Sequence, residues 1–155
     1  MGFRAYQKLN AWDAQSNATG IKQMNDLPKI KDIMATELVL LRPELEIIHA
    51  MKILLENRVS GAPVVDAEGL IVGVLSKKDC LRAALNASYH QEWGDPVSRY
   101  MSKNIETLDP ELDLVEATVK FLASDFRRFP VVKDNRLIGQ ISRADLLKAL
   151  IDNWS

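Results

Sequence analysis

The hydrophobic and polar positions of the chain follow one pattern that is written twice. Met34 and Met101 hold the same place in the two copies, an offset of 67 residues that becomes 66 after one residue is dropped. In each copy a short apolar run precedes a proline, and apolar residues three and four positions apart follow it, which predicts a strand and an amphipathic helix. Two β-rich runs and a second helical segment come next. Each copy is therefore predicted to be an α/β unit in the order strand, helix, strand, strand, helix.

The first strand and first helix of each copy are predicted around the prolines. Residues 38–41 are a short apolar run that predicts the first strand, and Pro43 is expected to begin the helix after it. In the second copy Asp109 is predicted to cap the helix, with Pro110 in the first helical position, where its missing N–H costs nothing.

The hairpins and last helices are predicted from turn residues and serines. The turn signals lie at residues 66–69 and 133–135, each between two β-rich runs. Ser76 and Ser142 should each end a strand and begin the final helix of their copy. Because two copies are too few for a solenoid, we expect a pseudo-symmetric pair in which each repeat buries its apolar face against the other.

The repeats divide the chain into four predicted parts. The first repeat spans residues 30–85 and the second 97–151, with a connector at 86–96 between them. Residues 1–29 are polar and weakly patterned, so we expect either a frayed arm or a segment that docks on a partner. Trp93 in the connector is expected to pack over the interface of the repeats.

Composition limits the classes of function. The chain is 47% hydrophobic and 26% charged with a formal net charge of −1, as in ordinary folded globular proteins. This balance supplies no positive field for a polyanion, so nucleic acid is not expected as the main partner. No apolar run is long enough for a signal peptide core or a membrane span, so we expect a cytoplasmic protein with no membrane partner.

The residues most typical of catalytic and metal sites are few. Cys80 is the only cysteine, so no intrachain disulfide forms, and we expect it to be a small buried apolar residue. His49 and His90 are the only histidines, and neither has a positioned acid and nucleophile. We therefore expect no catalytic residues, no metal site and no catalytic cofactor.

A Ser-x-x-Asp motif opens the last predicted helix of each copy. Ser76 with Asp79 and Ser142 with Asp145 place a hydroxyl, a carboxylate and the free N–H groups of a helix start around one point. A carboxylate accepts hydrogen bonds from two neighbouring ribose hydroxyls, and a helix start attracts phosphate. The alternative is a capping box, in which the serine and the acid only satisfy each other's main-chain N–H groups. The recurrence of the motif and the short Asp favour the ligand.

The doubled motifs resemble the cystathionine β-synthase (CBS) domain, and the tandem arrangement resembles the CBS pair, or Bateman module. Residues 59–66 read VSGAPVVD and 73–79 read GVLSKKD. The second copy keeps PVV at 130–132 and GQISRAD at 139–145, but has Arg-Arg-Phe at 127–129 before its proline. The resemblance covers residues 30 to 151 of the chain and implies an α/β pair of CBS repeats.

The resemblance further implies two clefts between the repeats that bind AMP, ADP, ATP or S-adenosylmethionine. Each cleft is expected to take its base wall from one repeat and its Ser-x-x-Asp motif from the other. The residues expected at the ribose and helix start are Ser76, Asp79, Ser142 and Asp145. The residues expected at phosphate are Lys77, Arg127, Arg128 and Arg143. The residues expected in the base wall are Val59, Ser60, Gly61, Ala62 and Phe126.

The two clefts are expected to be unequal. Arg127 and Arg128 precede the second repeat's proline, where the first repeat has Ser60 and Gly61. We expect both arginines to lie beside the phosphates of a ligand at Asp145, which would make that cleft the tighter one for phosphorylated ligands. The alternative is a solvated pair of loop charges.

These observations predict a non-catalytic regulatory module. Ligand binding between the repeats would change the shape or assembly of the protein, and a separate, unidentified partner would respond. The rival hypothesis is a ligand-free dimerisation module with vestigial clefts. In either case apolar helices that exceed what two small repeats can cover predict a homodimer.

Overall fold

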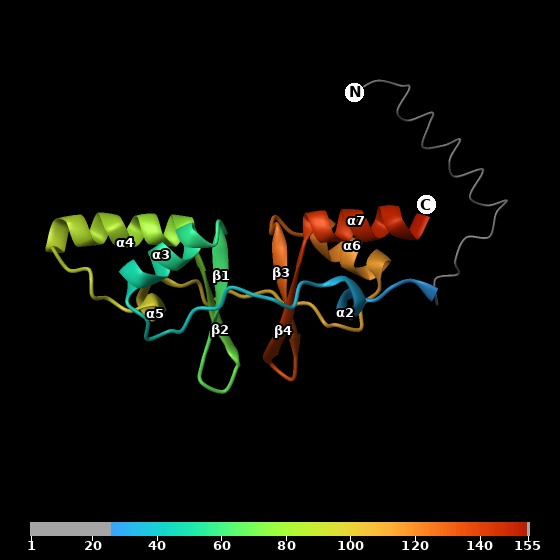
Figure 1. The fold of residues 1–155 in the computed structure, drawn as a ribbon, viewed down its shortest axis with the longest axis horizontal. Helices are drawn as coiled ribbons and strands as arrows, with labels where there is room; N and C mark the ends of the chain where they lie inside the picture. The colour runs from blue at the N-terminus through green and yellow to red at the C-terminus, as the bar shows by residue number, and fades with distance from the viewer. Residues whose placement is uncertain (1–25, 155) are drawn as a thin grey trace, which may run out of the picture.

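The computed structural model describes residues 26–154 as an elongated molecule with two β-hairpins side by side at its centre (Figure 1). The predicted arm at 1–29 therefore lies mostly outside the described residues. The elements in chain order are α2 (Ile30–Ile33), α3 (Ile47–Glu56), β1 (Gly61–Val65), β2 (Ile71–Ser76), α4 (Lys77–His90), α5 (Val97–Tyr100), α6 (Leu114–Leu122), β3 (Arg128–Lys133), β4 (Arg136–Ser142) and α7 (Arg143–Trp154). The two-repeat α/β fold predicted from the sequence is confirmed.

Both hairpins form where the turn residues predict them. β1 pairs antiparallel with β2, and β3 with β4. Asp134 and Asn135 have φ angles of 52° and 62°, and two consecutive positive φ angles are what a two-residue type I′ turn requires. In the first hairpin Gly69 has φ of 81°, while Asp66 Oδ1 accepts two main-chain N–H groups at 2.9 and 3.0 Å. The turns thus set the register that brings both Ser-x-x-Asp motifs to the start of a helix.

The first strand and first helix of each repeat differ from the prediction. The strand is reduced to one parallel bridge, from Leu41 to Val64 in the first repeat and from Leu108 to Val131 in the second. Helix α3 begins at Ile47 rather than Pro43, and α6 begins at Leu114 rather than Pro110.

The residue that caps α6 is also different. Asp113, not Asp109, accepts the N–H of Glu116 at 2.9 Å. The prolines lie in a preceding turn whose carbonyls accept hydrogen bonds from elsewhere in the chain. Pro43 O accepts from Ser98 N at 2.9 Å, and Pro110 O accepts from Lys31 N at 3.0 Å. Both donors belong to short helices that the sequence pattern did not predict.

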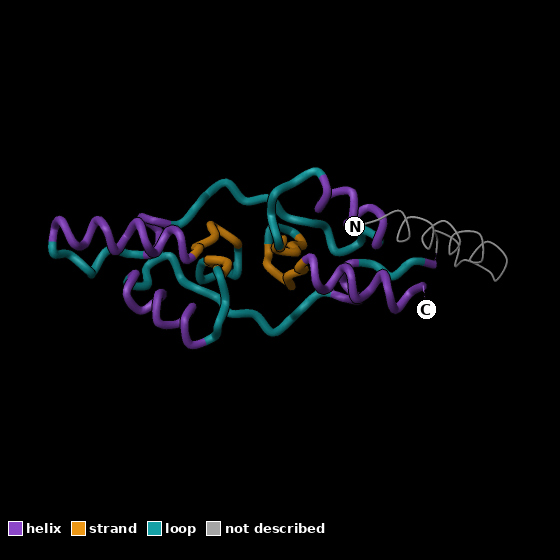
Figure 2. Tube along the Cα trace, turned by 90° about the horizontal axis from the view of Figure 1, so that it is seen from above, coloured by secondary structure: helices purple, strands orange, loops and turns teal. Residues whose placement is uncertain are grey.

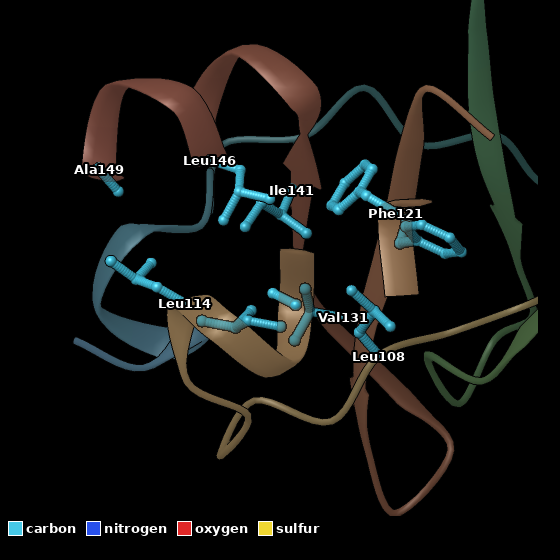
Figure 3. Close-up of a cluster of buried hydrophobic side chains, with 10 residues drawn as sticks. Leu108, Leu114, Phe121, Val131, Ile141, Leu146 and Ala149 are labelled. Atoms are coloured by element: carbon cyan, nitrogen blue, oxygen red, sulfur yellow. The ribbon is translucent and has the colours of Figure 1, made fainter. Parts of the chain in front are cut away.

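These short helices are exchanged between the repeats. Ile30 of α2 is fully buried in the core of the second repeat, part of which is drawn in Figure 3. Val97 of α5 is fully buried in the core of the first repeat. Each short helix thus completes the core of the repeat to which it does not belong in sequence. The two segments that cross between the repeats run on opposite sides of the hairpins (Figure 2).

Methionine and glycine hold each exchanged helix close to a strand. A Cβ at Gly139 would lie 2.8 Å from Met34 Cγ and 3.0 Å from the main-chain oxygen of Ala35. Gly73 faces Met101 in the same way, with Met101 Cγ also at 2.8 Å. Only glycine leaves room for this approach, which explains why the two methionines and two glycines recur at equivalent places in the repeats.

Ion pairs attach the start of α2 to the second repeat. The carboxylate of Glu111 accepts hydrogen bonds from Lys29 Nζ at 2.7 Å and Lys31 Nζ at 2.9 Å. These two ammonium groups lower the pKa of Glu111 to about 2. All three side chains are about half exposed, so the pairs orient α2 more than they stabilise it.

Helix α4 continues to His90 and so includes the first residues of the predicted connector. Trp93 follows the outer end of this helix and is 43% exposed, so the expectation that it packs over the repeat interface is wrong (Figure 1). Helical continuation carries the chain away from the centre before it turns back. Cys80 is buried as predicted, and burial raises the pKa of its thiol.

Candidate ligand-binding clefts

The Ser-x-x-Asp motifs lie where β2 meets α4 and where β4 meets α7. Asp79 N donates to Ser76 Oγ at 3.1 Å, and Ser76 N donates to Asp79 Oδ2 at 2.9 Å. Asp145 N and Ser142 N make the corresponding bonds at 3.1 and 2.9 Å. Each motif is therefore a capping box, as the alternative interpretation of the sequence proposed.

Capping leaves one oxygen of each carboxylate for a further role. Asp79 Oδ1 accepts a hydrogen bond from Arg82 Nη1 at 2.8 Å, and the side chain of Arg82 is 63% exposed. Asp145 Oδ1 has no hydrogen-bond partner within residues 26–154. Because an exposed arginine exchanges readily for another donor, both carboxylates retain an acceptor for a ligand, and capping does not exclude binding.

Each motif lines a cleft between the repeats. The Asp79 cleft has a volume of about 1260 Å³ and the Asp145 cleft about 200 Å³. Every residue that lines the Asp145 cleft has its repeat counterpart in the lining of the Asp79 cleft. Ala35 corresponds to Ser102 and Gln140 to Val74, for example. The two clefts are thus one site repeated by the pseudo-symmetry, open in one copy and narrow in the other.

The predicted base-wall residues are divided between the clefts. Ser60, Ala62 and Phe126 line the Asp79 cleft, Val59 lines the Asp145 cleft, and Gly61 lines both. The ring of Phe126 is 42% exposed and meets Phe129 edge to face at a centroid distance of 5.7 Å. The Asp79 cleft therefore offers an aromatic surface at the position where the other cleft has valine. In the Asp145 cleft these residues come from the first repeat and the Ser-x-x-Asp motif from the second, as expected, whereas in the Asp79 cleft they come from both repeats.

The predicted phosphate residues are placed differently from the expectation. Lys77 and Arg127 line the Asp79 cleft, Arg128 lines both clefts, and Arg143 lines neither. The expectation that Arg127 lies beside a ligand at Asp145 is wrong. The main chain of Arg127, rather than its side chain, contacts the start of α7, since the Arg127 carbonyl accepts the N–H of Arg143 at 3.0 Å. Arg127 itself lines the cleft on the opposite repeat.

Several lining residues were not predicted as site residues. The segment that crosses between the repeats after α5 contributes Ser102, Asn104, Ile105 and Glu106 to the Asp79 cleft. No local pattern marks this segment, because its place depends on the exchange of α5. Arg82 had a sequence signal, since a residue three positions after Asp79 lies on the same helix face.

Charge separates the clefts further. Five cationic residues line the Asp79 cleft against three acidic ones, which are Asp79, Glu106 and Asp125. The Asp145 cleft has one cationic residue, Arg128, against two acidic ones, Glu37 and Asp145. The larger cleft is therefore also the positively charged one. This arrangement reverses the basis on which the Asp145 cleft was expected to hold phosphate more tightly.

A family model for the CBS domain matches the chain at residues 30–86 and again at 97–152. The chain belongs to the CBS domain family. A 17.7 kDa uncharacterised protein of Acidianus ambivalens is 29% identical to this CBS pair over 125 residues, which are 80% of this chain and 74% of that protein. The inosine-5'-monophosphate dehydrogenase of Aquifex aeolicus is 29% identical over 132 residues, 82% of this chain but only 26% of the enzyme.

Solved CBS-pair structures share the fold. The crystal structure of CBSX2 in complex with AMP is 28% identical and superposes with a TM-score of 0.71, covering 81% of this chain and 97% of that chain. CBSX2 is a CBS-pair protein of Arabidopsis thaliana. Within residues 26–154 no helix is long and apolar enough to cross a membrane. The cytoplasmic location predicted from the sequence stays a prediction.

Proposed function

We propose that this CBS pair is a regulatory module that binds an adenosine-containing ligand in the clefts between its repeats. The observation that carries the proposal is the placement of both Ser-x-x-Asp motifs, each at a helix start and on the wall of a cleft with equivalent linings. The AMP held by CBSX2 supports this class of ligand. The candidates are AMP, ADP, ATP and S-adenosylmethionine.

The Asp79 cleft offers a group for each part of such a ligand. Asp79 Oδ1 accepts from the ribose hydroxyls once Arg82 releases it. Phe126 provides a flat apolar surface for the base. The positive end of α4 and the side chain of Lys77 attract the phosphate, while the N–H groups of Lys77 and Asp79 are bonded to Ser60 O and Ser76 Oγ. The Asp145 cleft has the same carboxylate and helix start in a smaller space.

The module itself has no catalysis in this proposal. Similar segments form only about a quarter of the dehydrogenase named above, where most of the chain lies outside the CBS pair. A ligand that binds between two repeats favours one arrangement of them, and a separate protein partner responds to that change. The remaining rival is a ligand-free interaction module with vestigial clefts.

AMP is expected to bind the protein and raise its melting temperature by about 5 to 10 °C at a hundredfold excess over its dissociation constant, which corresponds to roughly 2.7 kcal/mol of stabilisation. Isothermal titration calorimetry and thermal melts measure this with AMP, ADP, ATP and S-adenosylmethionine. Guanosine and cytidine nucleotides serve as controls and should shift the melting temperature less. Unchanged melts with all four adenosyl ligands at millimolar concentration would favour the ligand-free rival.

We further propose a homodimer that buries the long helices at either end of the molecule. Leu81 and Leu85 of α4 are 71% and 61% exposed, and their repeat counterparts on α7, Leu147 and Ile151, are 60% and 65% exposed. These residues form one apolar stripe on each helix, and residues 26–154 of a single chain leave both stripes uncovered. Light scattering is expected to give twice the 17.4 kDa mass of the chain. Replacement of Leu81 and Leu147 by lysine should yield the monomer, and a monomeric parent protein at micromolar concentration would contradict the proposal.

A further inference from the structure

We propose that the Asp79 cleft selects a nucleoside polyphosphate, with two or three phosphates, over a nucleoside monophosphate and over a nucleoside that carries a positively charged sulfonium. This inference rests on the proposed function, because it specifies the ligand of the same cleft. It depends on the number, origin and surroundings of the cations in that cleft.

The cations come from both repeats and face one cavity. The first two residues of α4, Lys77 and Lys78, lie on one wall, and Arg127 and Arg128, from the end of the α6–β3 loop and the start of β3, lie on the wall that the second repeat supplies. All four residues are exposed, so their charged groups are accessible to a ligand. None of the four takes part in an ion pair within residues 26–154. Four unpaired cations are thus available to one ligand.

The acidic residues of the cleft do not cancel this charge. Asp79 is paired with Arg82, so these two residues neutralise each other when the cleft is empty. Glu106 and Asp125 remain, against four free cations. When a ribose takes the acceptor oxygen of Asp79, Arg82 becomes a further free cation in the same cavity. A monophosphate carries about two negative charges, whereas a triphosphate supplies enough charge and oxygen atoms for cations on both walls.

The second cleft provides an internal comparison. The counterparts of Lys78, Arg127 and Arg128 in the repeat are Ala144, Ser60 and Gly61, which carry no charge. Lys78 and Arg127 therefore fall outside the repeat pattern that builds the fold, and they line the Asp79 cleft alone, whereas Arg128 lines both clefts and Lys77 corresponds to Arg143. A role in folding common to both repeats does not explain them.

The size of the Asp79 cleft agrees with a long ligand. Its volume of about 1260 Å³ exceeds the roughly 300 to 1,000 Å³ typical of small-molecule pockets. The Asp145 cleft, at about 200 Å³, falls below that range. The cavity that has room for a phosphate chain is thus the cavity that carries the charge to bind it.

Isothermal titration calorimetry of the whole protein at fixed ionic strength tests the selection with ATP, ADP, AMP, adenosine and S-adenosylmethionine. We expect ATP to bind at least tenfold more tightly than AMP, and S-adenosylmethionine to bind more weakly than AMP. The variant Lys78→Ala with Arg127→Ala removes two cations that line only the Asp79 cleft. Since charge-assisted hydrogen bonds each contribute about tenfold or more, it should lower ATP affinity at least tenfold and bring the ATP to AMP ratio near one.

The matched control removes two lysines outside the clefts, Lys120→Ala with Lys148→Ala, both exposed on helices. It changes the net charge equally and should alter the ATP affinity less than twofold. Equal affinity for ATP and AMP in the parent protein, or an equal loss of ATP affinity in the control variant, would overturn the selection of polyphosphate while leaving adenosyl binding in place.

Inorganic tripolyphosphate separates this inference from the proposed function. If no adenosyl ligand bound but tripolyphosphate did, and the binding was lost in the Lys78→Ala, Arg127→Ala variant, the adenosine part of the proposed function would be wrong and the polyphosphate site would stand. If neither bound, both would be overturned.

Discussion

Replacement of Asp79 by asparagine is expected to weaken AMP binding about 10- to 150-fold, with little loss of folding stability. The carboxylate is the acceptor for the ribose hydroxyls, and a charge-assisted hydrogen bond contributes roughly 1.5 to 3 kcal/mol. Asparagine keeps the shape and an oxygen that accepts the N–H of Ser76, so the cap of α4 survives. The substitution also removes the ion pair with Arg82. Because the arginine side chain is largely exposed, this pair contributes only about 0 to 1 kcal/mol to the free energy of unfolding. Calorimetry gives the affinity, and urea unfolding gives the stability.

Asp145→Asn is the matched control for this prediction. It changes the same atom in the same motif, but in the cleft of about 200 Å³. We expect AMP affinity to fall less than threefold, which is the reverse of the order predicted from sequence. Arg82→Ala tests whether the ion pair, rather than the carboxylate, is responsible, and it should leave adenosine binding intact. Equal losses in Asp79→Asn and Asp145→Asn would show that the clefts are equivalent.

Ile30→Ala is expected to destabilise the protein by about 2 to 5 kcal/mol, although Ile30 belongs to a helix of only four residues. The side chain is fully buried among Leu108, Leu114 and Val131, and the truncation leaves a cavity in the core of the second repeat. Urea unfolding measures the free energy. Hydrogen exchange should show that protection falls in residues 108–150, far along the chain from the substitution.

Val97→Ala is the reciprocal variant, since Val97 is fully buried in the core of the first repeat. Its loss of protection should fall in residues 41–90 instead. Ile33→Ala, at a partly buried position of the same helix as Ile30, should cost less than Ile30→Ala. Loss of protection within residues 41–90 in Ile30→Ala would contradict the exchange of the short helices.

Local patterns predicted the hairpins and the last helices correctly. Asn135 and Gly69 favour positive φ angles, and Ser76 and Ser142 cap helices through bonds to residues three positions away. Turns and helix caps are formed by residues close together in the sequence, so the residue types at those positions are enough to predict them. The whole two-repeat arrangement followed from the offset between Met34 and Met101, because a repeated pattern reports a repeated unit.

Features that depend on distant segments were not predictable in the same way. Pro43 and Pro110 have the local signature of a helix start, but their carbonyls bind α5 and α2 instead. Lys77 is the first residue of α4, as expected from Ser76 before it. Arg127 was assigned to the wrong cleft because its main chain, rather than its side chain, meets the start of α7. The position of Arg127 just before the second repeat's strand did not determine which cleft its side chain lines.

The reciprocal docking of α2 and α5 also bears on how a doubled chain of this kind arises. A solitary repeat would expose the groove that receives a short helix, and would carry a short helix with an apolar side chain such as Ile30 and nothing to cover it. Two identical copies satisfy both needs at once, whether they lie on separate chains or on one. The contacts between the halves are therefore those expected of an ancestral homodimer of single repeats. Gene fusion would preserve these contacts within one chain. Fusion also frees the two halves to diverge, and they now differ at Arg127 and Arg128, whose counterparts are Ser60 and Gly61.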